Sequence, residues 1–204
     1  MNILGISAFY HDSAACLVTD GRIEAAAQEE RFTRRKHDPS FPAQATRFCL
    51  DYANLSATDI DAVVFYEKPL EKFTRILESF VDAAPQGSTT FPHAMKTWIP
   101  RKIRQRRLLA VELAKAIGST SDSWRDRLFF SQHHLSHAAS AFFPSPFASA
   151  AVLTMDGVGE RETTTIYHGK DSSLIPVASI DFPNSLGLLY SAFTHYCGFK
   201  INSG

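Results

Sequence analysis

The chain has 204 residues, of which 45% are hydrophobic and 21% are charged, a composition that is typical of a globular protein and excludes a disordered chain. Its 21 lysine and arginine residues balance its 21 aspartate and glutamate residues, so the charge gives no reason to expect nucleic acid or an acidic membrane as the main partner. No apolar run approaches the roughly eighteen residues that cross a bilayer, and we expect no membrane partner.

The chain begins with three short apolar segments that are separated by turns. Residues 3–8, 14–19 and 23–28 have the composition of strands, and Asp20-Gly21 is typical of a two-residue hairpin turn. These signals predict a three-stranded antiparallel meander. The first connection, residues 9–13, is a polar loop that could hold a ligand against backbone amides.

Helices and strands alternate through the rest of the chain. Helical patterns cover residues 42–52, 70–81, 96–116, 135–143 and 185–195, and strand patterns cover residues 60–66, 128–130, 150–155, 163–167 and 174–180. The charge-dense segment 29–37 is interpreted as a solvated turn, residues 86–92 as a loop and residues 168–171 as a hairpin turn. A meander followed by this alternation predicts an α/β fold, half of an actin-like, ribonuclease-H-like domain.

The cysteines indicate a reducing environment. Cys16, Cys49 and Cys197 are odd in number, widely spaced and without a C-x-x-C pair, so we expect free thiols. The first residues show neither the basic region nor the long apolar core of a signal peptide. Both features predict a cytoplasmic protein.

Two histidines and an aspartate offer a set of metal ligands. His133 and His137 are four residues apart, so a helix would place both on one face, although this spacing also arises by chance on exposed helices. Asp156 follows a predicted strand, and strand ends are where ligands collect in open α/β sheets. Two imidazoles and a carboxylate suit Fe(II), with Zn(II) or Mn(II) left open. His134 points about 100° away from His133 on a helix and is expected to pack or cap instead.

Two weaker signals lie near the ends of predicted strands. Gly157 and Gly159 would permit close approach to a phosphate, but Asp-Gly-x-Gly also forms an ordinary turn. Glu67 or Lys68 either contacts a substrate or simply leaves the strand.

Residues 101–107 form a basic run that resembles a nucleic-acid contact. No aromatic pattern accompanies the run, and the rest of the chain is not basic. We therefore favour a solvated helix face and expect no nucleic-acid partner.

Four motifs, in order, resemble the O-carbamoyltransferase family, which contains nodulation and antibiotic-tailoring carbamoyltransferases. They are NILGIS with HDSAA (residues 2–7 and 11–15), EERFTRRKH (29–37), HHLSHA (133–138) and MDGVGE (155–160). The resemblance extends over residues 1–204. It implies an actin-like domain similar to the tRNA threonylcarbamoyl transferases, followed by a YrdC-like domain. In such enzymes carbamoyl phosphate and ATP give a carbamoyl-adenylate, and the carbamoyl group passes to a hydroxyl of a small molecule.

The resemblance also assigns roles to individual residues. His133, His137 and Asp156 match the family's iron ligands, and the metal would hold the adenylate phosphate or polarise the carbamoyl carbonyl. His11 matches the catalytic histidine that takes the proton from the attacking hydroxyl. Lys36 matches a residue that binds carbamoyl phosphate. Without the resemblance, the sequence is equally consistent with His11 as a surface histidine and with Lys36 as a charge on a solvated face.

On this interpretation residues 1–204 are the N-terminal portion of the actin-like domain. We expect the C-terminal half, the remaining metal and nucleotide ligands and the YrdC-like domain to be supplied in cis or in trans. The isolated piece would be inactive, and its exposed apolar surface would favour a homodimer or aggregation. Two alternatives stay open: a tRNA threonylcarbamoyl transferase relative with salt-sensitive tRNA binding, and an inert metal- or nucleotide-binding fragment. The sequence does not identify the acceptor.

Overall fold

The computed structural model describes residues 1–82, 84–85, 91, 96 and 104–201. The chain divides into two compact units. The first unit consists of Met1–Tyr66 and Met95–Ser131, and the second unit consists of Glu67–Ala94 and Gln132–Gly204. Each unit has its own β-sheet and its own cluster of buried hydrophobic side chains.

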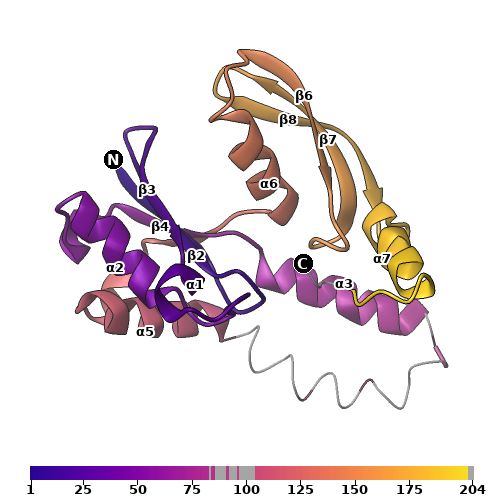
Figure 1. Cartoon of the computed structure of the whole chain (residues 1–204), viewed down its shortest axis with the longest axis horizontal. Helices are drawn as coiled ribbons and strands as arrows, with labels where there is room; N and C mark the ends of the chain where they lie inside the picture. Colours follow the sequence, from indigo (N-terminus) through magenta and orange to yellow (C-terminus); the bar gives the residue numbers. More distant parts are fainter. Residues whose placement is uncertain (83, 86–90, 92–95, 97–103, 202–204) are drawn as a thin grey trace. The chain divides into compact units, whose positions relative to one another are not determined.

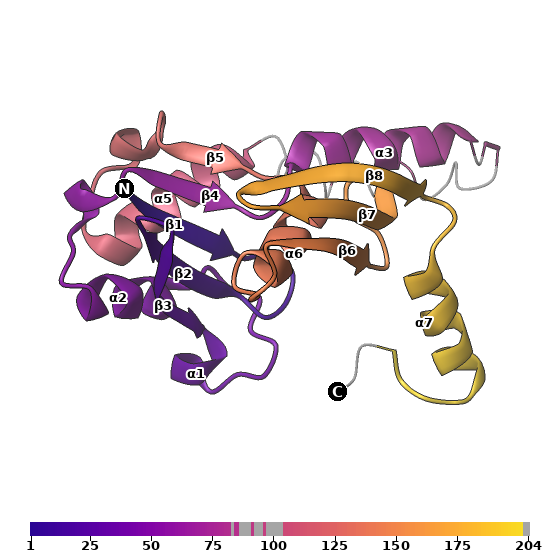
Figure 2. The same ribbon diagram turned by 90° about the horizontal axis from the view of Figure 1, so that it is seen from above.

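The first unit contains a mixed five-stranded sheet in the order β3-β2-β1-β4-β5 (Figures 1 and 2). Its strands are β1 (Asn2–Ser7), β2 (Ala14–Thr19), β3 (Arg22–Gln28), β4 (Ala62–Phe65) and β5 (Leu128–Phe130). β1, β2 and β3 form the predicted antiparallel meander, and β4 and β5 continue the sheet in parallel with β1. Asp20 and Gly21 have φ angles of 49° and 82°, as a tight hairpin turn requires. The predicted mixed α/β class with an antiparallel start is confirmed.

Helices cover this sheet with apolar side chains. The unit contains α1 (Glu30–Thr33), α2 (Ala43–Tyr52), α5 (Gln105–Ile117) and the 3-10 turns Ala57–Asp59 and Ser121–Trp124. α2 packs against β2, β3 and α5, and the core includes Leu4, Leu17, Phe65, Leu109 and Trp124. The carboxylate of Glu29, which is buried, accepts the N–H groups of Gln44 and Ala45 in the first turn of α2 at 3.1 and 2.9 Å.

The second unit contains an antiparallel three-stranded sheet in the order β6-β7-β8. Its elements are α3 (Pro69–Asp82), α6 (His133–Phe142), β6 (Ser149–Met155), β7 (Glu162–Lys170), β8 (Ser173–Asp181) and α7 (Leu186–Tyr196). α6 lies along the sheet (Figure 1). Its Ala138 and Phe142 side chains pack with Val152 and Tyr167. A Cβ atom at Gly169 would lie 2.6 Å from the Phe142 ring, so a glycine is needed beneath the helix.

The structure corrects the predicted start of one helix, one hairpin turn and the conformation of one charged segment. α6 begins at His133 rather than at residue 135, because the N–H of His133 finds an acceptor in Glu160. The β7–β8 turn is Asp171-Ser172 rather than residues 168–171, with Asp171 at φ 52°, so both strands are longer. Part of the expected solvated turn at 29–37 is the short helix α1.

Other predictions have narrower outcomes. Most of the predicted loop 86–92 and the start of the predicted helix 96–116 lie outside the described residues. The described part of that predicted helix corresponds to α5. All three cysteines are free thiols. Among the described helices, none has the length and apolar character to span a membrane.

Candidate metal centre

The orientation of α6 is set by one row of buried side chains. His134, Ala138 and Phe142 follow the four-residue spacing of a helix face and are buried against the sheet. The His134 Nδ1 atom is hydrogen-bonded to the hydroxyls of Thr154 on β6 and Thr165 on β7, at 2.8 and 3.0 Å. Burial lowers the pKa of His134, so its imidazole stays neutral. His134 therefore packs, as predicted, and it anchors the helix to the sheet.

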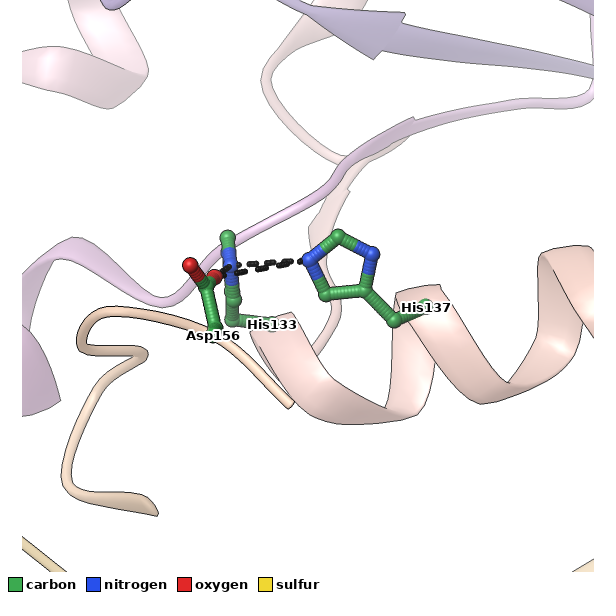
Figure 3. Close-up of side chains that lie close together, drawn as sticks. All are labelled: His133, His137 and Asp156. Atoms are coloured by element: carbon green, nitrogen blue, oxygen red, sulfur yellow. Dashed lines mark hydrogen bonds and ion pairs between the residues drawn. The ribbon is translucent and has the colours of Figure 1, made fainter. Parts of the chain in front are cut away.

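The adjacent row on α6 carries the two predicted ligands toward Asp156 (Figure 3). The His133 Nε2 atom lies 2.5 Å from Asp156 Oδ2 and 3.1 Å from His137 Nε2. His137 Nε2 lies 3.5 Å from the same Asp156 oxygen. Among the described residues, these three form the group of His, Cys, Asp and Glu side chains whose ligand atoms all lie within 4.8 Å of one another.

This triangle fits a divalent metal. Metal–nitrogen and metal–oxygen bonds of about 2.0–2.2 Å place neighbouring ligand atoms about 3 Å apart, and the observed separations bracket that value. The His133 side chain is 13% exposed whereas that of His137 is 53% exposed, so the group is open on one side. Hydrogen bonds from His133 and His137 lower the pKa of Asp156 against the opposing effect of burial, which keeps its carboxylate anionic.

The turn after β6 fixes the Asp156 carboxylate. The N–H of Gly157 donates to Asp156 Oδ1 at 2.6 Å, which leaves Oδ2 to face the imidazoles. The Ser185 hydroxyl, which caps α7 by accepting the N–H of Leu188, lies 2.7 Å from the Gly157 carbonyl. A Cβ atom at Gly187 would lie 2.5 Å from the Asp156 carbonyl, so α7 packs directly against this turn.

Of the two predicted phosphate-binding glycines, Gly159 has a packing role. The N–H of Gly157 is used by Asp156, and that of Gly159 donates to the Glu162 carbonyl at 2.9 Å. A Cβ atom at Gly159 would lie 2.8 Å from the His134 ring. A glycine at 159 is therefore needed for packing, and phosphate binding by this pair stays a prediction.

The predicted catalytic His11 lies in the first unit, in the loop between β1 and β2. Its Nδ1 atom lies 2.7 Å from Asp12 Oδ2, and the other Asp12 oxygen lies 2.9 Å from the Nδ1 atom of His37. The hydrogen bond from His37 is the main cause of the lowered pKa of Asp12. An ionised carboxylate only accepts hydrogen bonds, so this contact requires a proton on Nδ1 of His11, and in the neutral imidazole the lone pair is then on Nε2.

The two predicted substrate lysines lie in different units. Lys36 is exposed and precedes His37 in the first unit. In the second unit, the Lys68 ammonium lies 2.8 Å from Glu71, and its backbone N–H donates to Glu160. Substrate binding by either lysine stays a prediction.

In the described part of the basic run, Arg106 has a structural role. Arg106 donates to the carbonyls of Arg125 and Leu128 at 3.0 and 2.8 Å, and its guanidinium lies over the Phe130 ring. This arginine joins α5 to β5 and favours the helix-face interpretation. Residues 101–103 lie outside the described residues.

Residue patterns missed three side chains that organise these groups: Asp12, His37 and Glu160. Each lies inside a quoted motif, beside or four residues after a predicted functional residue. Their partners are distant in sequence, since Asp12 and His37 are separated by 25 positions and Glu160 and His133 by 27. The sequence signal that could have identified these three side chains was their position within a motif, close to a predicted functional residue.

Comparison with known proteins places the chain in a family. The family model described as Carbamoyltransferase N-terminus matches residues 2–204. An uncharacterized protein of Synechocystis is 55% identical over 203 residues, and nodulation protein NolNO of Sinorhizobium fredii is 34% identical over 193 residues. These matches cover 100% and 95% of this chain but only 33% and 26% of the two relatives. The chain belongs to the carbamoyltransferase N-terminus family.

Proposed function

We propose that this chain is the N-terminal part of an O-carbamoyltransferase that moves a carbamoyl group from carbamoyl phosphate to a hydroxyl of a small molecule. The family membership supports carbamoyl transfer. The observation that carries the metal-dependent form of the proposal is the convergence of His133, His137 and Asp156 on one point. The rest of the actin-like domain and a YrdC-like domain would complete the enzyme.

In the proposed reaction, carbamoyl phosphate, ATP and one water molecule give carbamoyl-adenylate, phosphate and pyrophosphate. The acceptor hydroxyl then attacks the carbamoyl carbon, AMP leaves, and the hydroxyl proton passes to Nε2 of His11. Asp12 keeps the Nδ1 proton of His11 in place and so leaves Nε2 as the base. Lys36 would neutralise phosphate charge.

The second unit would hold Fe(II), with Zn(II) or Mn(II) as further candidates. His133 and His137 supply neutral nitrogen ligands and Asp156 supplies an anionic oxygen. When bound, the metal would act as a Lewis acid on the phosphate or the carbamoyl oxygen. The exposed side of His137 leaves room for such a ligand.

The proposal is tested by acceptor-dependent release of AMP from the full enzyme, supplied with carbamoyl phosphate, ATP and a panel of hydroxyl compounds. We expect His11→Ala to lower this rate by about 10²–10⁴-fold, because a positioned general base is lost. Metal content should not change, since His11 is not a ligand in the proposed centre. AMP release by the variant at the parental rate would contradict the role of His11.

A further inference from the structure

Glu160 is a buried carboxylate to which the proposed chemistry gives no task. Its residue surface is 2% exposed, and it follows Asp156 by four positions. Glu160 Oε2 accepts the backbone N–H of His133 at 2.8 Å, and Oε1 accepts the N–H of Lys68 at 2.7 Å. One carboxylate thus joins the first residue of α6 to the residue that precedes α3.

Physical reasons explain why a carboxylate lies here. The first N–H groups of a helix have no acceptor within the helix, and the positive end of the helix dipole attracts an anion. Arg75 on α3 adds an attractive charge. These interactions oppose the effect of burial, which is the larger effect and raises the pKa of Glu160.

The turn from Asp156 to Glu160 therefore contacts α6 in two ways. The side chain of Asp156 approaches the imidazole of His133, while the side chain of Glu160 holds the backbone N–H of the same histidine. A displaced helix end would move His133 Nε2 away from Asp156, because the side chain follows its backbone. Metal affinity depends on such convergence of ligand atoms.

We propose that Glu160 is a positioning residue of the metal centre, which fixes the N-terminus of α6 so that His133 and Asp156 converge. This inference rests on the proposed function, in which the two residues share a metal. Glu160 does not contact the metal itself in this arrangement. Its effect reaches the centre through the His133 backbone.

The informative substitution is Glu160→Gln, which preserves size and removes one acceptor oxygen. If the amide oxygen stays with Lys68, the amide NH₂ faces the His133 N–H, and two donors oppose each other. Glu78→Gln is the matched control, because Glu78 on α3 pairs with Arg161, the residue after Glu160, and this pair is exposed. The control removes a carboxylate between the same two segments without touching α6.

The experiment is a Co(II) titration of the full enzyme, as the wild type and as both variants, with the visible Co(II) spectrum, thermal unfolding of the metal-free proteins, and amide hydrogen exchange of the peptide that contains His133. We expect Glu160→Gln to weaken Co(II) binding by about 10–100-fold, to change the spectrum and to speed exchange at His133. Glu78→Gln should bind as the wild type does. A purely structural role would lower the unfolding temperature without changing the spectrum or affinity of the folded protein.

Each outcome has a distinct meaning. If Glu160→Gln exchanges faster at His133 yet binds Co(II) with the wild-type affinity and spectrum, the positioning role is wrong. If that variant does not fold, Glu160→Asp replaces it, since aspartate retains the charge but is one methylene too short, and the same criteria apply. Absence of Co(II) binding by the wild-type full enzyme would overturn the metal centre and the role of Glu160 together.

Discussion

The two units each place a carboxylate between two imidazoles, and the arrangements differ in one respect. In the first unit, Asp12 uses separate oxygens to reach the Nδ1 atoms of His11 and His37, at 2.7 and 2.9 Å. In the second unit, the single oxygen Oδ2 of Asp156 faces the Nε2 atoms of both histidines. The carboxylate of Asp12 therefore bridges two imidazoles through separate oxygens, whereas one oxygen of Asp156 and the two imidazole nitrogens converge on a common point.

This difference separates a hydrogen-bonded group from the proposed metal centre, which contains the same residue types. A bridging carboxylate occupies Nδ1 on each ring and leaves Nε2 directed elsewhere, which suits proton transfer. Convergent Nε2 and Oδ2 atoms about 3 Å apart enclose the position of a metal ion. The backbone contributes as well: Asp12 and His37 have φ angles of 48° and 58°, while His133 and His137 lie on a regular helix.

The sharpest way to break the comparison is the same substitution at both carboxylates. We expect Asp156→Asn to weaken Fe(II) or Co(II) binding by more than about 100-fold, beyond the effect of removing an outer hydrogen-bond partner, because an anionic ligand becomes neutral. Asp12→Asn should leave metal affinity within about twofold of the parent, because Asp12 is not one of the proposed ligands. Anaerobic reconstitution followed by metal analysis measures both.

Two further variants sharpen that result. Loss of binding in His133→Ala/His137→Ala, together with Asp156→Asn, would establish the three ligands. Unchanged binding in His137→Ala alone would contradict the triad. A chain in which Asp12→Asn is as damaging as Asp156→Asn would show that the two imidazole groups are not independent.

A smaller effect is expected on catalysis from Asp12→Asn. The asparagine amide can donate to Nδ1 of His11 and so favour the tautomer whose Nε2 carries the proton, which is no longer a base. We expect kcat for acceptor-dependent AMP release to fall by about 10–100-fold, with little change in KM and full metal content.

His37→Gln provides the comparison for that measurement, because it removes the second imidazole and leaves the His11–Asp12 contact in place. Its rate should stay closer to the parental rate than that of Asp12→Asn. Equal rates in the parent and Asp12→Asn would show that the orientation of His11 does not depend on this carboxylate.

The local periodicity of the sequence predicted most of the features that position the candidate metal ligands in the second unit. The four-residue spacing of His133 and His137 indicated a shared face, and the apolar run at 150–155 indicated a strand that delivers Asp156. The parallel row His134, Ala138 and Phe142 explains why that shared face is turned toward the turn after β6. These features depend on neighbours within a few residues, and sequence patterns report such neighbours well.

Contacts between distant segments were not predictable in the same way. Nothing in the pattern around Glu160 shows that its oxygens accept N–H groups from residues 27 and 92 positions away. The bridge from Asp12 to His37 likewise depends on two left-handed backbone conformations that hydrophobic spacing does not encode. The predicted start of α6 was wrong for the same reason: the distant carboxylate of Glu160 accepts the N–H of His133 and extends the helix to that residue.

The smallest expected effect concerns acid stability in the first unit. The hydrogen bond from His37 lowers the pKa of Asp12 in the folded protein, so the unfolded chain takes up the proton first as the pH falls. The stabilising effect of Asp12 is therefore complete above its ordinary pKa of about 4 and is lost as the pH falls through the lower folded value. Because the side chain is 34% exposed, we expect a shift of a few degrees at most in the unfolding temperature. Asp12→Asn should make the unfolding temperature less dependent on pH between about 5 and 2, whereas Asp122→Asn, at an exposed surface pair, should not. Identical pH profiles for the parent and Asp12→Asn would show that the bridge does not favour the ionised carboxylate over its protonated form.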